Sequence, residues 1–245
     1  MAMSAATPRT RLVLDFLRAF GRSLRNSEDT HALLEAEELT SVWQMPRIRR
    51  ELATHAEGRR LLIEQPLINS GTTEWDQLRA LPSDRLGARY MAHLDANGLD
   101  PDALCVEVTR GPDPTSNYLL ARIRQTHDIW HTMLGLGTEG YEEVLVHAFQ
   151  WPQLRMNYSA AVVCFGTLKH FIAEARWRLL VGRAIRDALR AGQVASPLLA
   201  VHWEDYWDVP LSQLRQRLGV TPAEQWPSMR DLSTRRRGPQ NLGPS

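Results

Sequence analysis

His127-Asp128-Ile129-Trp130-His131 is the stretch around which the chain is organised, and Glu143 follows it after eleven intervening residues. If residues 116–134 form a helix, a rotation of roughly 100° per residue places the two histidines and Asp128 on one side of it. That side also carries four apolar residues, Leu120, Ile123, Trp130 and Leu134. Two imidazoles and a carboxylate therefore lie on a helix face that the pattern predicts to be buried.

The residues after this stretch predict a turn that brings Glu143 back toward the histidines. Gly135 and Gly137 can end the first helix, and Thr138 can cap a second helix that carries Glu143 in its early turns. A buried carboxylate without a positive partner is costly. We therefore predict that a divalent metal lies among these groups.

Other interpretations of the same residues remain open. Histidines four residues apart on a helix are a common metal-binding pair, but they also occur as hydrogen-bonded core residues. Glu142 is an alternative to Glu143, because helical phase does not decide between neighbours. His147, one turn beyond Glu143, is an extra ligand or a residue that supports one. Imidazoles and carboxylates suit zinc and also accept iron or manganese.

The spacing H-D-x-x-H-x(11)-E resembles the signature of the coenzyme Q (ubiquinone) biosynthesis "Coq four" family, in its bacterial-type form. The likeness extends over roughly residues 12–220. It includes AEGRRLL at residues 56–62 with QPLI at 65–68, LP at 81–82 with LGARY at 86–90, and Glu204 and Trp207 before LRQRLGV at 214–220. The turn departs from the family pattern, because two glycines stand where many members carry proline and asparagine. We expect a looser hinge there.

The resemblance implies an all-α fold and a ligand set of His127, Asp128, His131 and Glu143, with zinc as the first choice. It implies a role in ubiquinone biosynthesis in which the C1 carboxylate of a polyprenylated ring is replaced by a hydroxyl. The chain would then be a metal-dependent decarboxylase or hydroxylase. Its partners would be the polyprenyl quinone precursor, other ubiquinone-biosynthesis proteins, a membrane surface and, in a homo-oligomer, further copies of itself.

Two alternatives from other classes compete with this interpretation. One is a non-catalytic scaffold that binds prenyl lipids and presents them to other enzymes, with a structural metal. The other is a metal phosphohydrolase of the HD type, suggested by the doublet His127-Asp128, for which His93 and Asp187 would have to complete the site. That second alternative leaves His131 and Glu143 without a role.

Composition describes an ordinary globular protein of 245 residues, with 43% hydrophobic and 23% charged residues. A net charge of +1 argues against a dedicated nucleic-acid binder, and Lys169 is the single lysine among 29 basic residues. Cys105 and Cys164 imply no disulfide framework. The longest apolar run, residues 160–168, is about half of a bilayer crossing. We expect a cytoplasmic protein that is peripheral to the inner face of the cell membrane.

Along the chain the pattern predicts a single-domain multi-helix bundle over residues 9–220, between a disordered start at 1–8 and a flexible basic tail at 221–245. Residues 9–25 form a basic amphipathic helix that suits an anionic lipid surface or packs on the body. Residues 158–181 are the best candidate for a central buried helix, and the small residues Ser159, Ala160, Ala161 and Gly166 in it leave room for an apolar groove or allow close helix packing. Only residues 106–109 favour an extended segment. The other helices are expected at residues 26–43, 47–55, 82–97, 116–134, 138–152, 182–191, 198–207 and 210–218. Thr115 or Ser116 is expected to cap the helix at 116–134.

Overall fold

The computed structural model describes residues 30–173 and 178–229 of the chain. Within these ranges all regular elements are helices, and the β pairing is limited to one isolated bridge between Arg85 and Pro210. The all-α prediction is confirmed, and residues 106–109 form no strand. The predicted disordered start, the basic helix at 9–25 and the tail beyond residue 229 lie outside the described residues.

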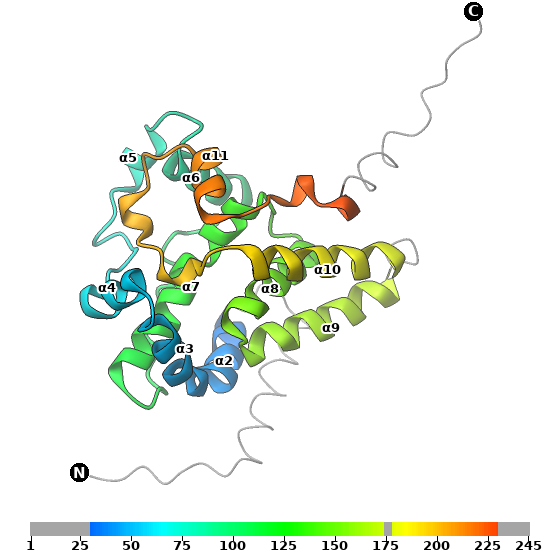
Figure 1. The fold of residues 1–245 in the computed structure, drawn as a ribbon, viewed down its shortest axis with the longest axis horizontal. Helices are drawn as coiled ribbons and strands as arrows, with labels where there is room; N and C mark the ends of the chain where they lie inside the picture. The colour runs from blue at the N-terminus through cyan, green and yellow to red at the C-terminus, as the bar shows by residue number, and fades with distance from the viewer. Residues whose placement is uncertain (1–29, 174–177, 230–245) are drawn as a thin grey trace, which may run out of the picture.

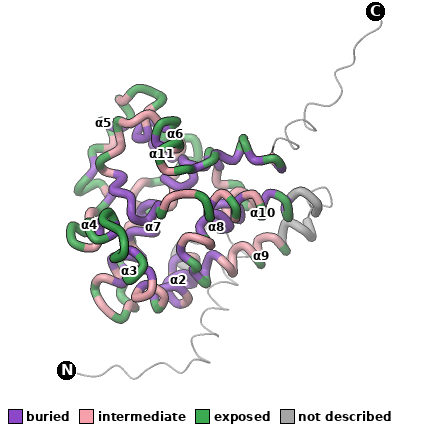
Figure 2. The backbone as a smooth tube through the Cα atoms, viewed as in Figure 1, coloured by how far each residue is buried: buried purple, intermediate pink, exposed green. Residues whose placement is uncertain are grey.

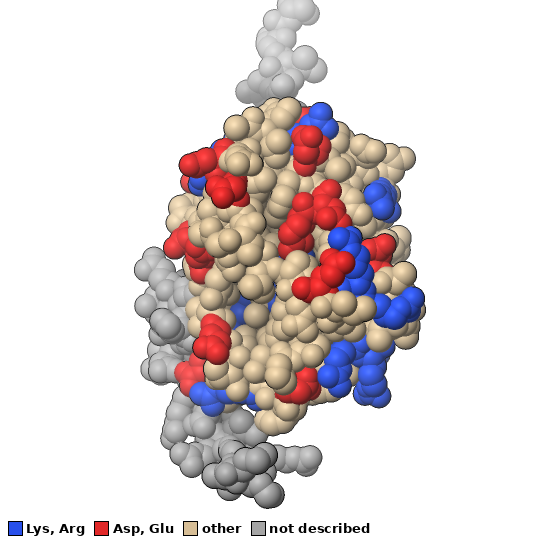
Figure 3. Space-filling model, turned by 90° about the vertical axis from the view of Figure 1, so that its left-hand side faces the viewer, with Lys and Arg blue, Asp and Glu red and all other residues tan. Residues whose placement is uncertain are grey.

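Figure 1 shows the helices as a bundle crossed by α7, with α9 and α10 as a pair along one side. Among the described residues no helix is both long and apolar enough to pass through a bilayer. On the face drawn in Figure 3, acidic and basic side chains are mixed, as the near-neutral net charge predicts. In chain order the elements are α2 (Thr30–Ser41), η1 (Val42–Gln44), α3 (Met45–Leu52), α4 (Ala56–Glu64), α5 (Trp75–Arg79), α6 (Leu86–Asn97), α7 (Pro114–Leu134), α8 (Gly140–Leu154), α9 (Asn157–Ala173), α10 (Arg178–Val194), η3 (Leu198–Ala200), η4 (Trp203–Asp205), α11 (Leu211–Leu218) and η5 (Ala223–Gln225).

The helix that carries the sequence motif, α7, is the central element, and most of its residues are buried. It begins one residue after Asp113, whose carboxylate accepts a hydrogen bond from the Ser116 backbone N–H at 3.0 Å. Pro114 fills the first helical position, where a missing N–H costs nothing. The cap is therefore Asp113, and the prediction of Thr115 or Ser116 was wrong because Pro114 already lies inside the helix.

The polar residues of α7 explain why it is more central than its composition suggests. Arg122 and Arg124 are both buried, and each is paired with a carboxylate, Glu204 for Arg122 and Glu37 for Arg124. A buried charge is tolerated when it is paired and hydrogen-bonded. The two ion pairs thus attach α7 to η4 and α2, which lie far from it in the sequence.

The second motif helix, α8, begins at a capping box and not at the predicted cap. The side chain of Glu139 accepts from the backbone at Glu142, and the Glu142 side chain accepts from the Glu139 N–H at 3.2 Å. Such reciprocal bonds satisfy the free N–H groups of a first turn. Thr138 instead donates to the side chain of Asn97 in α6 at 2.9 Å.

The predicted central helix at residues 158–181 was wrong in both length and position. The structure has α9 ending at Ala173 and α10 beginning at Arg178, and α9 lies at the edge of the molecule with Phe165 and Leu168 exposed (Figure 2). The small residues serve close packing where α9 meets α8. Ser159 is buried, and a Cβ added to Gly166 would stand 2.5 Å from a methyl carbon of Val144.

The C-terminal part differs from the predictions in two places. The helix expected at residues 198–207 is two short 3-10 turns, η3 and η4. Residues 221–229, which were predicted to belong to a flexible tail, pack on the body, because Ala223 and Trp226 are buried and the Trp226 indole donates to the Thr221 carbonyl at 3.0 Å. Ser228 also donates to the Asp187 carboxylate at 2.7 Å. Aromatic burial here outweighs the loop-forming composition of the segment.

Candidate metal centre

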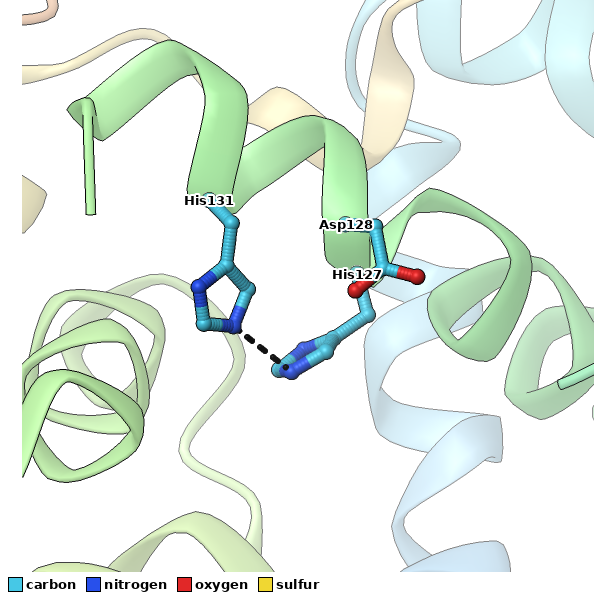
Figure 4. Close-up of side chains that lie close together, drawn as sticks. All are labelled: His127, Asp128 and His131. Carbon is cyan, nitrogen blue, oxygen red and sulfur yellow. Dashed lines mark hydrogen bonds between the residues drawn. The ribbon is translucent and has the colours of Figure 1, made fainter. Parts of the chain in front are cut away.

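The imidazoles of α7 meet at their Nε2 atoms. His127 and His131 are one turn apart, and the distance between the two Nε2 atoms is 3.1 Å (Figure 4). Asp128 lies next to His127, and one donor atom from each of these three residues can be chosen so that all lie within 4.8 Å of one another. The helix thus brings donor atoms of the three residues near one another, and the two imidazoles point toward each other.

Glu143 reaches the same point from α8. One carboxylate oxygen lies 3.2 Å from Nε2 of His131 and the other lies 3.3 Å from Nε2 of His127. The alternative, Glu142, is engaged in the capping box of α8. The geometry therefore favours Glu143 over its neighbour. Its side chain is 35% exposed, so the cluster can be reached from solvent on this side.

The turn between α7 and α8 is tied down, which contradicts the expected looser hinge. Gly135 adopts a φ of +68°, and the backbone N–H groups of Gly135 and Leu136 donate to Thr132 and His131 carbonyls at 3.3 and 3.1 Å. This is the glycine-ended termination in which both free carbonyls are satisfied. Glycine at this position fixes the end of the helix, because it adopts the left-handed conformation without steric cost.

The same turn also orients a ring of the cluster. Nδ1 of His131 lies 2.8 Å from the Gly137 carbonyl oxygen, which can only accept, so this nitrogen carries the proton. In the neutral ring, which is the form that binds a metal, Nε2 of His131 then carries the lone pair and lies beside Glu143 and His127. Histidines that bind metals are held in this way by a second hydrogen bond on the remote nitrogen.

Two further histidines lie at the cluster. His147 is buried, and its Nε2 lies 3.8 Å from Glu143. His93 of α6 stacks on His131, with 5.5 Å between the ring centroids, and its buried Nε2 has no hydrogen-bond partner among the described residues. His147 could be recognised in the sequence from its position one turn after Glu143. His93 was considered in the sequence only for the phosphohydrolase alternative, because it comes from a helix that is distant in the sequence from the motif.

The electrostatics of the cluster are those of an ion pair when no metal is present. Burial alone would lower the pKa of His127, but the charge of Glu143 and a hydrogen bond to it raise that pKa to about 9. Burial alone would raise the pKa of Glu143, but His131 and His127 hold it well below its usual range. Burial lowers the pKa of His147 to about 3 and that of His93 to about 4.

The donor set fits a divalent metal. Two imidazole nitrogens and a carboxylate converge on one point, and among the described residues the charges that lower the pKa of this carboxylate are those of the protonated imidazoles of His131 and His127. A divalent ion supplies that charge and leaves the imidazoles neutral, as ligation requires. The residues required by the phosphohydrolase alternative do not assemble, because Asp187 accepts from Ser228 instead and belongs to neither of the candidate metal groups.

The fold is all-α, and histidines and a carboxylate meet between two consecutive helices. The protein is therefore a helical protein with a candidate metal centre. The chain belongs to the Coq4 family, because the profile of "Coenzyme Q (ubiquinone) biosynthesis protein Coq4" matches residues 4–224. This confirms the resemblance found in the sequence.

Individual relatives agree with this membership. The mitochondrial ubiquinone biosynthesis protein COQ4 homolog of Aedes aegypti is 33% identical over 188 residues, which is 75% of this chain and 66% of the relative. The Mus musculus homolog is 29% identical over 209 residues, covering 83% of this chain and 76% of the relative. The aligned region thus spans about two thirds of the Aedes protein's length. Both relatives are mitochondrial by name, whereas the cytoplasmic location of this chain stays a prediction.

A solved structure shares the fold. The crystal structure of a ubiquinone-biosynthesis candidate from Nostoc punctiforme superposes with a TM-score of 0.71 at 23% sequence identity. The match covers 88% of this chain and 100% of the Nostoc chain. The helical arrangement is therefore one that a solved structure also has.

Proposed function

We propose that this chain acts in ubiquinone biosynthesis as a metal-dependent enzyme that works on a polyprenylated ring intermediate. The convergence of His127, His131 and Glu143 from two consecutive helices is the observation that carries the proposal. The names of the Aedes aegypti and Mus musculus relatives support the pathway. Zinc is our first choice of metal, with iron or manganese as alternatives, because imidazole and carboxylate donors bind all three.

The proposed reaction replaces the C1 carboxylate of the ring by a hydroxyl. The bond from the ring to the carboxyl carbon breaks and carbon dioxide leaves. One oxygen atom of dioxygen forms the new hydroxyl, and the other leaves as water with two protons and two electrons, which an external two-electron donor must supply. The bound metal would polarise the ring carboxylate or phenolate as a Lewis acid and, if redox-active, supply electrons. We propose no further acid or base from the chain.

The residues of the chain hold the donors and leave one side open. His131 is fully buried and oriented by the Gly137 carbonyl, whereas Glu143 is partly exposed, so a substrate would approach from the side of the carboxylate. Trp130 is buried and packs edge-on against Phe149, with ring centroids 6.0 Å apart. Its ring therefore serves packing and does not stack on a substrate.

The prenyl chain of such a substrate is apolar and lies in a bilayer. Phe165 and Leu168 of α9 are exposed apolar residues, which supports a contact with the prenyl chain or with a membrane surface. The same observation favours the second candidate function, a prenyl-lipid-binding scaffold that presents intermediates to other ubiquinone-biosynthesis proteins. In that case the metal would be structural.

Replacing His131 separates the two functions. His131→Ala is expressed in a quinone-producing host that lacks its own homologue, and quinone, metal content and co-purifying proteins are measured. We expect loss of quinone from a folded, metal-free protein that keeps its partners. His55→Ala, at an exposed position, is the control and should retain quinone synthesis. Quinone synthesis that survives loss of the metal would overturn the enzymatic proposal and favour the scaffold.

A further inference from the structure

His147 lies on the same helix as Glu143, one turn further on, and points at the same carboxylate. Its Nε2 is 3.8 Å from the Glu143 oxygen that also lies 3.3 Å from Nε2 of His127. The rings of His127 and His147 are 5.5 Å apart between centroids. One donor atom each from His127, Glu143 and His147 can be chosen within 4.8 Å of one another.

The remote nitrogen of His147, like that of His131, has a hydrogen-bond partner. Nδ1 of His147 lies 3.3 Å from the Ser159 hydroxyl oxygen, and both residues are buried. If Nδ1–H donates to this hydroxyl, the Nε2 lone pair faces Glu143, as it does in His131. A hydrogen bond on one ring nitrogen that aims the other at a common point is the arrangement of a metal-bound histidine.

Asp128 is placed less favourably for the same role. It follows His127 directly, and one residue along a helix is a rotation of roughly 100°, so the two side chains diverge. Figure 4 shows its carboxylate beside the stem of His127, away from the line that joins the two imidazole nitrogens. Glu143 has close contacts with the imidazoles of His127, His131 and His147, all through Nε2.

We propose that His147 completes the metal centre with His127, His131 and Glu143, and that Asp128 is not a direct ligand. This inference rests on the proposed metal site. Three neutral imidazoles and one carboxylate around a divalent ion leave a net charge of +1, whereas two imidazoles and two carboxylates would leave none. A positive centre favours an anionic ligand, which fits a ring carboxylate or phenolate as substrate.

The test compares zinc binding by the full-length protein and by three matched variants. His147→Asn keeps a donor near the position of Nδ1 and removes Nε2, and Asp128→Asn removes the charge of the rival ligand. His93→Phe preserves the stacking on His131 and removes only the nitrogens of a ring outside the set. Zinc affinity is measured by competition with a chromophoric chelator, and circular dichroism verifies the fold.

We expect His147→Asn to weaken zinc binding by more than about 100-fold and Asp128→Asn by less than about tenfold, because losing a ligand costs more than losing a neighbour of one. His93→Phe should leave the affinity unchanged. X-ray absorption of the zinc-loaded wild type should show three imidazole ligands. That measurement needs no variant, so it decides the matter even if His147→Asn does not fold.

Each outcome separates this inference from the proposed function. If Asp128→Asn loses zinc and His147→Asn retains it, or if absorption shows two imidazoles in the wild type, His147 is not a ligand and the metal centre itself still stands. If His131→Ala, the variant used to test the proposed function, binds zinc as tightly as the wild type, or if neither binds it, the metal centre falls and this inference falls with it.

Discussion

The ion pair between Arg122 and Glu204 gives a prediction in which two partners of one interaction should behave differently. The Arg122 side chain has 0% exposure, and its guanidinium donates to both carboxylate oxygens of Glu204 at 2.6 and 2.9 Å. Glu204 is 25% exposed. Removing either residue breaks the same pair, but the charge that remains is fully buried in one case and accessible to water in the other.

Glu204→Ala should therefore cost more stability than Arg122→Met. The first leaves an unpaired cation in the interior, for which about 3–5 kcal/mol is typical. The second replaces the arginine by an apolar side chain and leaves a carboxylate that water can reach, so the loss of its charged hydrogen bonds costs about 1–3 kcal/mol. Arg122 also donates to the carbonyls of Pro66 and Val201, and the loss of these hydrogen bonds adds to the cost of Arg122→Met.

Urea unfolding of the two variants and of the double variant measures these costs. For a domain of this size each kcal/mol lowers Tm by about 2–4 °C, so thermal unfolding should show the same order. The double variant should be more stable than Glu204→Ala, because it removes the stranded charge. The reasoning is refuted if Arg122→Met is as destabilising as Glu204→Ala, or if the double variant is the least stable of the three.

Three further predictions concern helix packing and the metal centre. Gly192→Ala should lower the free energy of unfolding by about 1–3 kcal/mol, because the added Cβ would lie 2.1 Å from the Phe149 carbonyl oxygen. Gly182→Ala in the same helix meets no atom of the described residues within 4 Å and should raise the free energy of unfolding by about 0.5–1 kcal/mol. Denaturant unfolding compares the two variants. Arg215→Met removes the guanidinium that donates to two of the last carbonyls of α7, those of Met133 and Thr132, at 2.8 and 3.1 Å. Because this loosens the turn that orients the cluster, zinc binding in the chelator assay should weaken about tenfold, and unchanged binding would refute this. The pKa of His127 is raised to about 9, so this ring is in its protonated, positively charged form at neutral pH in the metal-free protein. Zinc binding should therefore release about one proton from His127 and should strengthen as the pH rises to about 9. Calorimetry in buffers of different ionisation enthalpy counts the protons released.

Local signals predicted α7 and its end well. The spacing of the histidines on an apolar face fixed which side of the helix is buried, and Gly135 marked its last turn. Both signals depend on residues within a few positions of each other. The predicted cap was two or three residues too late, because Asp113, Thr115 and Ser116 are all residue types that cap helices. Pro114 lies in the first helical position, and this excludes Thr115 and Ser116 as the cap.

Burial was harder to predict where polar residues are involved. The apolar composition of residues 158–181 favoured one central helix, yet α9 is peripheral, with Phe165 and Leu168 exposed. Arg122 and Arg124 make the sequence of α7 appear too polar for a buried helix, although both side chains are buried. Their partners, Glu204 and Glu37, lie more than eighty residues away, so no local pattern could reveal that these charges are neutralised.

The turn between α7 and α8 shows that the spacing of the motif residues predicts which side chains meet, but does not predict how rigid the connection between the two helices is. Two glycines suggested freedom, but Gly135 ends the helix and the Gly137 carbonyl holds the His131 ring. A side chain at position 137 would place its Cβ 2.8 Å from the carboxylate of Glu142, which caps α8. One compact turn thus orients an imidazole on α7 and sets the start of the helix that carries Glu143. The left-handed conformation explains glycine at position 135, whereas at position 137 an added Cβ would meet only the end of a flexible side chain.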